Sequence, residues 1–370
     1  MKKLLMTASV YSHIQSFHLP YLQEFRRLGW ETHIGCSQIP DTLPACIDCA
    51  IELTFRKRMS AYENFQAAMV LRKRIRAEQY DLIITHTSLA AFFTRLALKG
   101  IKGQARLVNV VHGYLFDDET PAIKRSILLN AERFTAAETD LVLTMNAWDY
   151  LAAQKYRLGK QIEKIPGMGV DFSRLDPASE EDGQALRAVL GIPSSAFVVI
   201  CPAEFSERKS QHILIEAMAK LPPEAVLVLP GSGALLEDCK SLARRLSLEE
   251  RVWFPGFVSE LAPWYRMADA AVTASRSEGL PFSVMEAMYC GLPVAASAVK
   301  GHLDLINDGI TGLLYPYGDV SACAACIDRF MTDAAFRETA ASASKAAVQD
   351  YALEKVLPTV VHMYLQLEQT

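Results

Sequence analysis

Apolar residues follow two alternating patterns along the chain: short continuous runs, and longer segments in which they recur at helical spacing. Short runs bounded by polar residues are typical of buried strands, and the longer segments predict helices that pack on them. In the first half, the patterns predict strands at 4–8, 32–36, 82–85, 107–111 and 141–145 and helices at 19–28, 90–98 and 127–137. This alternation predicts a parallel sheet with helices on both faces.

The pattern is interrupted near the middle of the chain and then starts again. Pro166, Gly167 and Gly169 lie within four residues of one another, and the acidic segment 179–183 follows soon after. Such punctuation is typical of a boundary between domains. Beyond it, the same alternation predicts elements at 197–201, 212–220, 225–229, 252–254, 270–274 and 293–296.

The fold class that we expect is α/β, with two Rossmann-like domains in tandem that face each other across a cleft. A length of 370 residues fits two domains at roughly 150 residues each. We place an N-terminal domain at 1–168 and a C-terminal domain at 169–350. We expect a C-terminal helix at 351–370 to return to the N-terminal domain.

The composition is that of a soluble globular protein. Hydrophobic residues make up 51% and charged residues 22%, and no run reaches the roughly 18 apolar residues that a transmembrane helix needs. The first residues turn polar too early for a signal peptide, so we expect a cytoplasmic protein. Cys46 with Cys49, and Cys323 with Cys326, have metal-ligand or redox spacing. The two pairs lie far apart in the chain, however, and the favoured interpretation is spare thiols.

The net charge of −4 excludes a broadly basic nucleic-acid binder, but it conceals a split. Residues 1–170 hold 22 Lys and Arg against 16 Asp and Glu, a balance of +6, and the remainder holds 16 against 26, a balance of −10. The basic excess lies at 56–58 and 72–76, which flank a segment with apolar residues at helical spacing: Tyr62, Phe65, Met69 and Val70. One interpretation is that this strip packs on the sheet and the charges are solvated. The alternatives are that the basic residues bind a phosphate-bearing acceptor, or that the segment docks on an anionic membrane surface at the inner face of the cell membrane.

Most of the unusual polar and glycine residues directly follow predicted strands. Ligands of open α/β sheets bind beyond the carboxyl ends of the strands, so these positions are where chemistry is expected. The residues selected in this way are His13, His18, His112, 204–209, Gly231, Gly233 and Glu278.

The most specific motif runs from Ser277 to Met288 and contains two glutamates. Glu278 lies on the loop after a predicted strand, and Gly279 lets the backbone approach a ligand closely. Pro281 suits the first position of a helix whose free N–H groups and positive dipole end point at the same place. Glu286 then falls about one turn inside that helix. Two carboxylates arranged in this way can bind two sets of hydroxyl groups of one extended ligand, as sugars provide.

This motif resembles that of the retaining family-4 glycosyltransferases, whose hallmark is two glutamates with seven residues between them. The resemblance covers nearly the whole chain and is strongest to bacterial capsule and exopolysaccharide glycosyltransferases, which build the two-domain GT-B fold. It implies that the N-terminal domain binds the acceptor and the C-terminal domain the nucleotide sugar. It also implies that Glu286 holds the ribose hydroxyls of the nucleotide. Glu278 and the backbone of Gly279, Leu280, Pro281 and Phe282 would hold the donor sugar.

The resemblance also assigns the loop at 203–210 to the donor diphosphate. Family members usually carry an Arg here and a Lys five residues later; Lys209 matches the Lys, but Glu204 replaces the Arg. A fixed cation stabilises the negative charge that grows on a leaving diphosphate. We therefore expect Lys209 to act in catalysis, with Arg208 sharing the work or Glu204 pointing away and orienting Lys209.

Three histidines and two further positions complete the predicted site. A strand delivers His112 to the domain's ligand-binding edge, and the resemblance implies that it touches the donor sugar and the reacting phosphate. His13 and His18 are assigned to the acceptor side, on a loop that lacks the glycines of its relatives. Gly231 is expected to flank the donor pocket, and Val258, beside Phe257, lies where relatives read the nucleobase through backbone groups.

The sequence contains no Asp-x-Asp signature, so we expect catalysis without a metal ion or other cofactor. The predicted function is transfer of a hexosyl or N-acetylhexosaminyl group from a nucleotide sugar, UDP-linked, to a saccharide or lipid-diphosphate-linked acceptor in surface polysaccharide synthesis. The alternatives are a nucleotide-sugar epimerase of the same architecture and a nicotinamide oxidoreductase, for which the glycine fingerprint is missing. A sugar-binding module without activity would not need Lys209 and His112.

Overall fold

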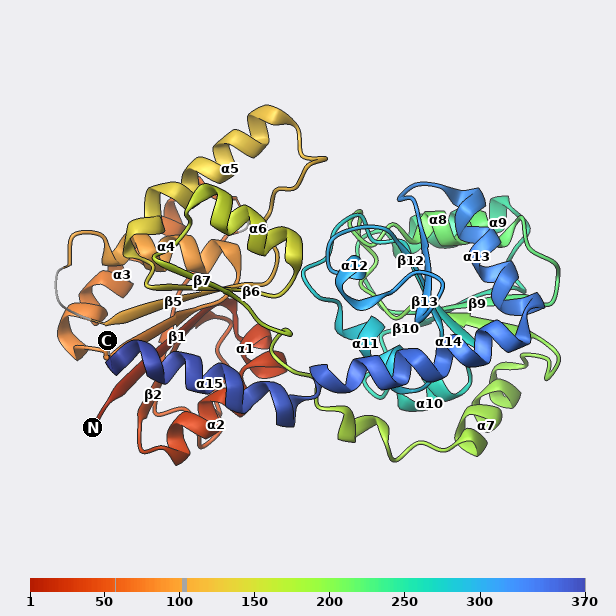
Figure 1. Ribbon diagram of the computed structural model, residues 1–370, viewed down its shortest axis with the longest axis horizontal. Coiled ribbons are helices and arrows are strands. Elements are labelled where there is room, and N and C mark those ends of the chain that lie inside the picture. Colours follow the sequence, from red (N-terminus) through yellow and green to blue (C-terminus); the bar gives the residue numbers. More distant parts are fainter. Residues whose placement is uncertain (57, 102–104, 370) are drawn as a thin grey trace. The chain divides into compact units, whose positions relative to one another are not determined.

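The computed structural model describes residues 1–56, 58–101 and 105–369, and the chain divides into two compact units (Figure 1). The N-terminal unit comprises Met1–Met168 together with Glu354–Thr370, and the C-terminal unit comprises Gly169–Leu353. Lys57, in the first predicted basic block, lies outside the described residues.

The N-terminal unit is built on a seven-stranded parallel sheet with the order β3-β2-β1-β4-β5-β6-β7. The central strands are apolar on both sides because helices cover both faces of the sheet. The strands are β1 (Lys3–Val10), β2 (Glu31–Ser37), β3 (Cys49–Glu52), β4 (Leu82–Thr85), β5 (Arg106–Val111), β6 (Leu141–Thr144) and β7 (Gln161–Lys164).

Helices cover both faces of this sheet, with α3, α4, α5 and α6 on one side and α1, α2 and α15 on the other (Figure 1). On the first face, Leu71 and Phe93 pack on Ile83. On the second face, the ring of Tyr364 contacts the rings of Tyr21 and Phe25. The helices are α1 (Tyr11–Phe17), α2 (Leu19–Arg27), α3 (Tyr62–Glu78), α4 (Ser88–Leu98), α5 (Ala122–Thr135), α6 (Ala147–Tyr156) and α15 (Leu353–Gln369), with a 3₁₀ turn at Ala136–Glu138.

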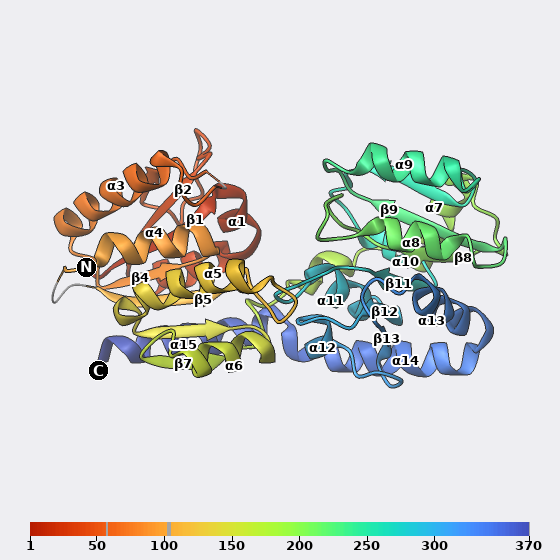
Figure 2. The same ribbon diagram turned by 90° about the horizontal axis from the view of Figure 1, so that it is seen from above.

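The C-terminal unit repeats this plan with a six-stranded parallel sheet in the order β10-β9-β8-β11-β12-β13. The view from above shows β9, β8, β11, β12 and β13 following one another in that order (Figure 2). The strands are β8 (Phe197–Ile200), β9 (Ala225–Pro230), β10 (Val252–Gly256), β11 (Ala270–Thr273), β12 (Val294–Ser297) and β13 (Gly312–Tyr315).

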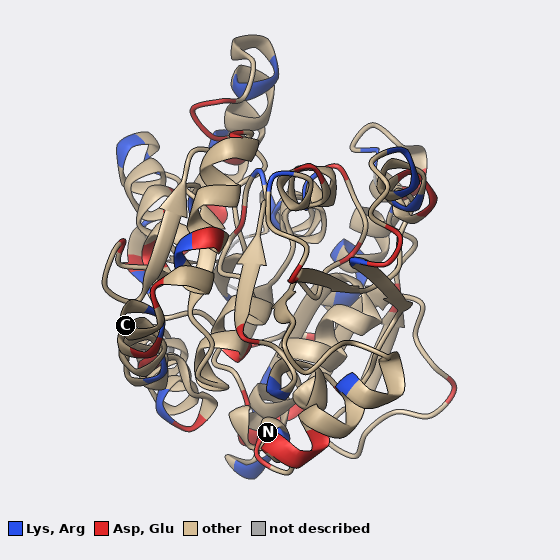
Figure 3. Ribbon diagram, turned by 90° about the vertical axis from the view of Figure 1, so that its right-hand side faces the viewer, with Lys and Arg blue, Asp and Glu red and all other residues tan. Residues whose placement is uncertain are grey.

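Helices again pack on both faces, and α8, α9 and α13 share one apolar core with the strands. Asp and Glu alternate with Lys and Arg on neighbouring segments, without a face of one sign in the view of Figure 3. The helices are α7 (Glu180–Leu190), α8 (Gln211–Met218), α9 (Leu236–Arg245), α10 (Ala262–Arg266), α11 (Phe282–Tyr289), α12 (His302–Leu305), α13 (Val320–Thr332) and α14 (Ala334–Ala347), with 3₁₀ turns at Phe172–Leu175 and Val348–Tyr351.

The two parallel α/β sheets confirm the predicted fold class, and three local expectations need correction. The apolar strip on α3 reaches the core only through Phe65, whose ring contacts Phe93, and Tyr62 and Met69 are each 72% exposed. The core contact of this helix is made by other side chains: Ala67, Ala68, Leu71 and Ile75. His13 lies on α1 and not on a loop. Pro281 is the N-cap of α11, and the first helical residue is Phe282.

No helix within the described parts of the chain combines the length and the apolar character needed to cross a membrane. The cysteines of the two pairs, like the other four, are free thiols.

Candidate active site

The two glutamates of the motif lie where the carboxyl end of β11 leads into α11. Glu278 is on the connecting loop and is 7% exposed, and Glu286 is inside the helix and is 4% exposed. Of the other predicted donor residues here, Leu280 and Pro281 are buried, and Gly279 and Phe282 are half-buried. Buried carboxylates are costly unless cations or hydrogen bonds compensate them, so their partners indicate what this edge of the sheet is built to do.

Glu278 is held between two cations from the loop after β8. Lys209 Nζ donates to its Oε1 at 2.7 Å, and Arg208 Nη1 donates to its Oε2 at 2.7 Å. Burial would raise the pKa of Glu278, but Lys209 and Arg208 outweigh it and lower the pKa to about 2. The predicted residues Glu278, Lys209 and Arg208 therefore form one cluster within the C-terminal unit.

This cluster has an excess of positive charge. Two cations face one carboxylate, and the N-terminal end of α11 adds its free N–H groups at the same loop. Glu204 does not orient Lys209, because the Lys209 ammonium binds Glu278 and the Glu204 side chain is exposed. The arrangement can bind an anion such as a diphosphate.

Glu286 has partners that the sequence did not reveal. One of its carboxylate oxygens accepts from Arg174, and the other accepts from the Tyr265 hydroxyl at 2.9 Å. Burial raises the pKa of Glu286, and Arg174 and Tyr265 oppose that rise. Arg174 lies on the 3₁₀ turn Phe172–Leu175 just after the predicted domain boundary, a signal too short to be recognised in the sequence.

His302 is a second residue of this unit that sequence reasoning missed. Its ring is fully buried, with Nδ1 2.8 Å from the carbonyl oxygen of Ser297, and it contributes to the low pKa of Glu278. The loop that carries His302 approaches the Glu278 loop so closely that a Cβ on Gly301 would lie 2.8 Å from the carbonyl oxygen of Gly279. The ends of β11 and β12 thus support the Glu278 loop together.

A pocket of about 300 Å³ lies at the carboxyl ends of β8, β9 and β10. The predicted residues Gly231 and Val258 line it, together with Pro202, Ala203, Glu204, Pro230, Ser232, Phe257 and Leu261. Gly231 has a positive φ, and a Cβ there would overlap with the carbonyl oxygen of Ala203. The glycine is therefore required for the two loops to approach each other, and this approach shapes the pocket wall.

In the N-terminal unit, the predicted histidines gather at one point. His112 follows β5, His13 is on α1 and His18 lies between α1 and α2; His86, which follows β4, joins them. The ring centroids of His13 and His112 are 4.7 Å apart, and those of His18 and His86 are 3.5 Å apart. Burial lowers the pKa of His13 to about 4 and lowers the pKa values of the other three. His86 could have been found in the sequence, because it also directly follows a strand.

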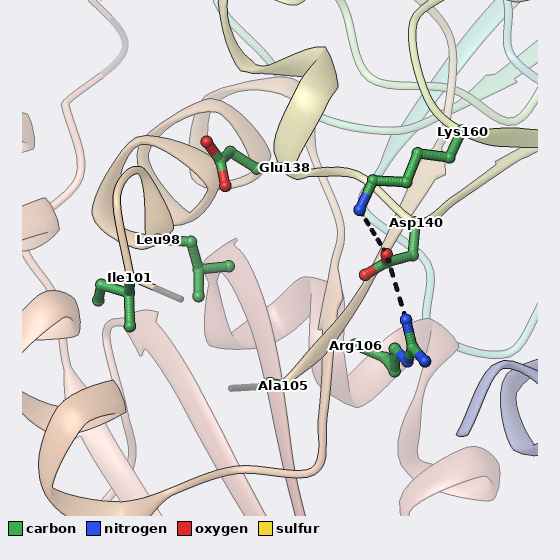
Figure 4. Close-up of a pocket in the computed structure, with 7 residues that line it drawn as sticks. All are labelled: Leu98, Ile101, Ala105, Arg106, Glu138, Asp140 and Lys160. Atoms are coloured by element: carbon green, nitrogen blue, oxygen red, sulfur yellow. Dashed lines mark hydrogen bonds and ion pairs between the residues drawn. The ribbon is translucent and has the colours of Figure 1, made fainter. Parts of the chain in front are cut away.

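A further pocket, of about 400 Å³, lies at the opposite edge of the N-terminal sheet (Figure 4). Asp140 accepts from Lys160 at 2.8 Å and lies 3.8 Å from Arg106, and it also caps the start of β5 by accepting from the Leu107 N–H. These groups satisfy one another at the amino ends of the strands, which is not where open α/β sheets bind ligands. We therefore do not regard this pocket as a candidate active site.

Comparison with known proteins identifies the family to which this chain belongs. The chain matches the family model of glycosyl transferases group 1 over residues 182–349 and that of glycosyltransferase family 4 over residues 21–174. It is 32% identical over 333 residues to the putative glycosyltransferase EpsD of Bacillus subtilis (strain 168), covering 89% of this chain and 87% of EpsD.

Two further proteins extend the comparison. The UDP-Gal:alpha-D-GlcNAc-diphosphoundecaprenol alpha-1,3-galactosyltransferase of Escherichia coli is 23% identical over 360 residues, covering 94% of this chain and 92% of the relative. The crystal structure of Anabaena HepE in complex with UDP and glucose matches with a TM-score of 0.80 at 22% identity, covering 99% of this chain and 100% of HepE. The HepE match shows that the fold is shared over the whole chain.

Proposed function

The chain belongs to the family-4 glycosyltransferases of the GT-B fold, and we propose that it is a retaining enzyme that takes its sugar from a UDP-linked donor. The transferred group is a hexosyl or N-acetylhexosaminyl unit. The acceptor is a saccharide or a lipid-diphosphate-linked saccharide, used in the synthesis of a bacterial surface polysaccharide.

The observation that carries this proposal is the buried Glu278 held between Lys209 and Arg208. An ordinary ion pair has one cation for one carboxylate. Here two cations bind the same carboxylate, so one positive charge remains for a diphosphate. A hydrogen bond to a charged group contributes about 1.5–3 kcal/mol of binding free energy. The negative charge of the diphosphate grows during transfer, so the cations stabilise the transition state more than the bound donor. The cluster is therefore suited to stabilising a departing nucleoside diphosphate.

The same arrangement favours retention of configuration. The acceptor hydroxyl oxygen forms a bond to the anomeric carbon on the face from which the diphosphate oxygen leaves, and a phosphate oxygen takes up the hydroxyl proton. Glu278 is a poor candidate for a covalent nucleophile, because two cations stabilise its charge and hold its oxygens. We therefore assign Lys209 to charge stabilisation, Glu278 to the donor sugar and His112 to the donor sugar and reacting phosphate.

The pocket that Gly231 and Val258 line is proposed to hold the nucleobase. It lies at the carboxyl ends of three strands, and its volume suits a small planar ring. A UDP-linked donor is supported by the UDP named in the HepE structure and by the UDP-Gal named for the Escherichia coli relative. The alpha-D-GlcNAc-diphosphoundecaprenol named for that relative supports a lipid-diphosphate-linked acceptor, which we assign to the N-terminal unit with His13 and His18 on the acceptor side.

A donor screen tests the proposal. Nucleotide sugars are added singly, and the shift of the unfolding temperature is measured; a donor at 100 times its Kd adds about 2.7 kcal/mol to the free energy of unfolding. The stabilising donor is then incubated with an undecaprenyl-diphosphate sugar, and the anomeric configuration of the product is read by NMR. Retention is expected, and an inverted product would refute the mechanism.

The same screen separates the two rival activities. An epimerase would release or convert the sugar from the donor alone, without an acceptor, whereas a transferase requires the acceptor for rapid turnover. An oxidoreductase would bind NADH, and NADH is expected to cause no thermal shift. Conversion of the donor at full rate without any acceptor would favour the epimerase.

We further propose that the N-terminal unit attaches reversibly to an anionic membrane surface. Tyr62 and Met69 on α3 are largely exposed, and Phe65 and Val70 extend the same strip. Lys73 and Arg76, in the last turns of the helix, are exposed beside Met69, with which they line an open groove. Apolar side chains beside cations are the combination that binds a membrane interface, at about 1 kcal/mol per favourably placed charge.

Not every predicted charge is available for this attachment. Arg72 donates to the carbonyl oxygens of Ala97 and Lys99 at 2.8 Å each and so fastens α3 to the end of α4. Arg74 lies 3.5 Å from Glu78. Lys73 and Arg76 are therefore the charges of choice for a test.

A second exposed strip on α5 supports the membrane proposal, and the sequence analysis did not single it out. Ile123, Ile127 and Phe134 lie on one side of this helix and are all more than half exposed. Lys124 and Arg133 are exposed on the same helix. Both α3 and α5 cover the same face of the N-terminal sheet (Figure 1).

Vesicle flotation tests the attachment. Binding is expected to rise with the fraction of anionic lipid, to fall with salt, and to weaken about tenfold or more in the double variant Lys73→Gln/Arg76→Gln, which removes about 2 kcal/mol. The matched control Lys220→Gln/Arg245→Gln removes two exposed charges from the C-terminal unit and should bind like the parent. Equal binding to neutral and anionic vesicles would end this proposal and leave the transferase proposal intact.

A further inference from the structure

Four histidines from separate parts of the N-terminal unit bring their rings to one point. His13 comes from α1, His18 from the corner between α1 and α2, His86 from the end of β4 and His112 from the end of β5. His18 and His86 are completely buried, and His13 and His112 are half-buried. Neither helix formation nor the sheet requires imidazoles at these places, and the roles proposed above for His13, His18 and His112 do not account for His86.

The spacing of the ring nitrogens fits a single small ion. One nitrogen from each ring can be chosen such that all four lie within 4.8 Å of one another, and His86 Nδ1 is 3.1 Å from His112 Nε2. A tetrahedral ion with metal–nitrogen bonds of about 2.0–2.1 Å holds its ligand atoms about 3.3 Å apart. The rings would have to shift to bring all four nitrogens to this spacing, and His18 and His86, whose rings are stacked with centroids 3.5 Å apart, would have to separate.

The cluster also contains buried polar atoms without a partner. Within the described residues, no hydrogen bond reaches either ring nitrogen of His18, Nε2 of His13 or Nε2 of His86. A buried polar atom without a partner costs about 1–3 kcal/mol. The ring–ring contacts of the cluster are with one another and with Phe17 and Tyr21, and no ion pair to a carboxylate is found for these histidines among the described residues.

We propose that these four histidines form a binding site for one Zn²⁺ ion. Neutral imidazoles are the protonation state that binds transition metals, and a four-nitrogen set favours zinc over the hard cations Mg²⁺ and Ca²⁺, which prefer oxygen ligands. With four protein ligands the site is closed. The ion would fasten α1 and the α1–α2 corner to the ends of β4 and β5.

Another group of possible ligands in the same unit provides a control. Glu31, His33 and Glu78 are also close enough to share an ion. Their partners are already present: Lys3 Nζ donates to Glu78 at 2.8 Å, and His33 is hydrogen-bonded to Glu31 and Tyr80. Zinc would have to displace these bonds, so this group is expected to bind much more weakly.

Calorimetry with ZnCl₂ alone tests the site, using protein without an affinity tag that has been stripped with EDTA. One Zn²⁺ per chain is expected. Co²⁺ should bind in its place and give the visible absorption of a tetrahedral nitrogen site. His86→Gln should weaken zinc binding by more than about 100-fold, because even partners outside the ligand set are typically worth 10–100-fold.

The controls separate this site from other zinc binding. Glu78→Gln alters the second ligand group, and His212→Gln removes an exposed histidine on α8; both should bind zinc like the parent. His13→Gln, at a half-buried position, serves as a second variant if His86→Gln does not fold. Zinc binding that persists in both His86→Gln and His13→Gln, or that is lost in Glu78→Gln, would overturn the assignment.

An activity measurement adds a consequence that rests on the proposed function. A zinc ion would hold the His112 imidazole and withhold it from the donor sugar, so micromolar Zn²⁺ should inhibit transfer and EDTA should restore it. Stoichiometric zinc binding without inhibition would leave the metal site standing and would remove His112 from the proposed mechanism. No zinc binding in calorimetry would refute the site, whatever the activity.

Discussion

The two units use the same edge of the same kind of sheet in opposite ways. In the C-terminal unit, buried charge is compensated: Glu278 lies between Lys209 and Arg208, and its pKa falls to about 2 despite its burial. In the N-terminal unit, burial of the His13 ring lowers its pKa to about 4, which leaves the ring uncharged at neutral pH.

This difference shows how one architecture can divide the work of a transfer reaction. The fold places loops at the strand ends in both units, but the residues on those loops decide which ligand is favoured. Paired charges with a cation in excess suit a diphosphate, whereas uncharged imidazoles suit a hydroxyl group or a metal ion. On this division, the charge needed for transfer resides in the C-terminal unit.

The largest effect is expected from Lys209→Ala. It removes one of the two cations that would face the leaving diphosphate, so kcat should fall roughly 10²–10³-fold while donor affinity changes much less. Steady-state kinetics measure this split, and thermal unfolding checks that the variant is folded. Lys220→Ala, an exposed lysine at the end of α8, is the matched control and should be unaffected. Normal turnover with only a raised KM would make Lys209 a ground-state contact.

A smaller effect is expected from Glu286→Ala. The family resemblance predicts that the Glu286 carboxylate accepts hydrogen bonds from ribose, and on that assignment its loss should weaken binding of UDP by roughly 1.5–3 kcal/mol, or about ten- to hundredfold. Calorimetry with UDP alone measures it. Glu286→Gln retains an acceptor for the Tyr265 hydroxyl and should lose less affinity than Glu286→Ala. UDP affinity that is unchanged in both variants would contradict the assignment.

The pH dependence of stability tests the compensation of Glu278. Its pKa is lowered from 4.5 to about 2 by folding, so its contribution to the free energy of unfolding is complete above pH 4.5 and is lost as the pH falls towards 2. Between pH 5 and pH 3, the parent should lose roughly 2 kcal/mol more stability than Glu278→Gln, which lacks this titration. Urea unfolding at several pH values measures the difference. Parallel curves for the two proteins would show that the cations do not stabilise the carboxylate.

Much of the fold could be predicted because its central strands are largely apolar. Leu82–Thr85 was predicted to the residue, and most other strands to within one or two residues. The missed strands have a physical reason. β3 and β7 lie at the edges of their sheet, and β7 has the sequence Gln-Ile-Glu-Lys, in which only Ile162 is apolar. β13, which was missed as well, is an edge strand of the other sheet. A continuous apolar run marks a strand in the sequence only where both faces of the sheet are buried at that strand.

The clustering of Glu278 with Lys209 could be anticipated from the sequence, because each residue lies on a loop that follows a strand. Partners that are remote in sequence could not be predicted: Arg174 reaches Glu286 across 112 positions, and nothing in a local pattern links them. His86 was missed although it follows a strand, because a single histidine in His86-Thr87 carries no motif of its own. Its importance comes from three other rings that only the folded unit brings beside it.

Removal of divalent ions is expected to leave the rate of sugar transfer unchanged. This prediction tests most directly whether the C-terminal unit alone supplies the charge that transfer needs. Lys209, Arg208 and the N-terminal end of α11 together offer the diphosphate the charge that a magnesium ion would otherwise supply. Initial rates in excess EDTA should therefore equal those with Mg²⁺, while zinc at the histidine cluster of the N-terminal unit should only slow the reaction. If activity disappeared in EDTA and magnesium restored it, a metal ion would have to share the diphosphate with Lys209. The charge needed for catalysis would then not be built into the C-terminal unit alone.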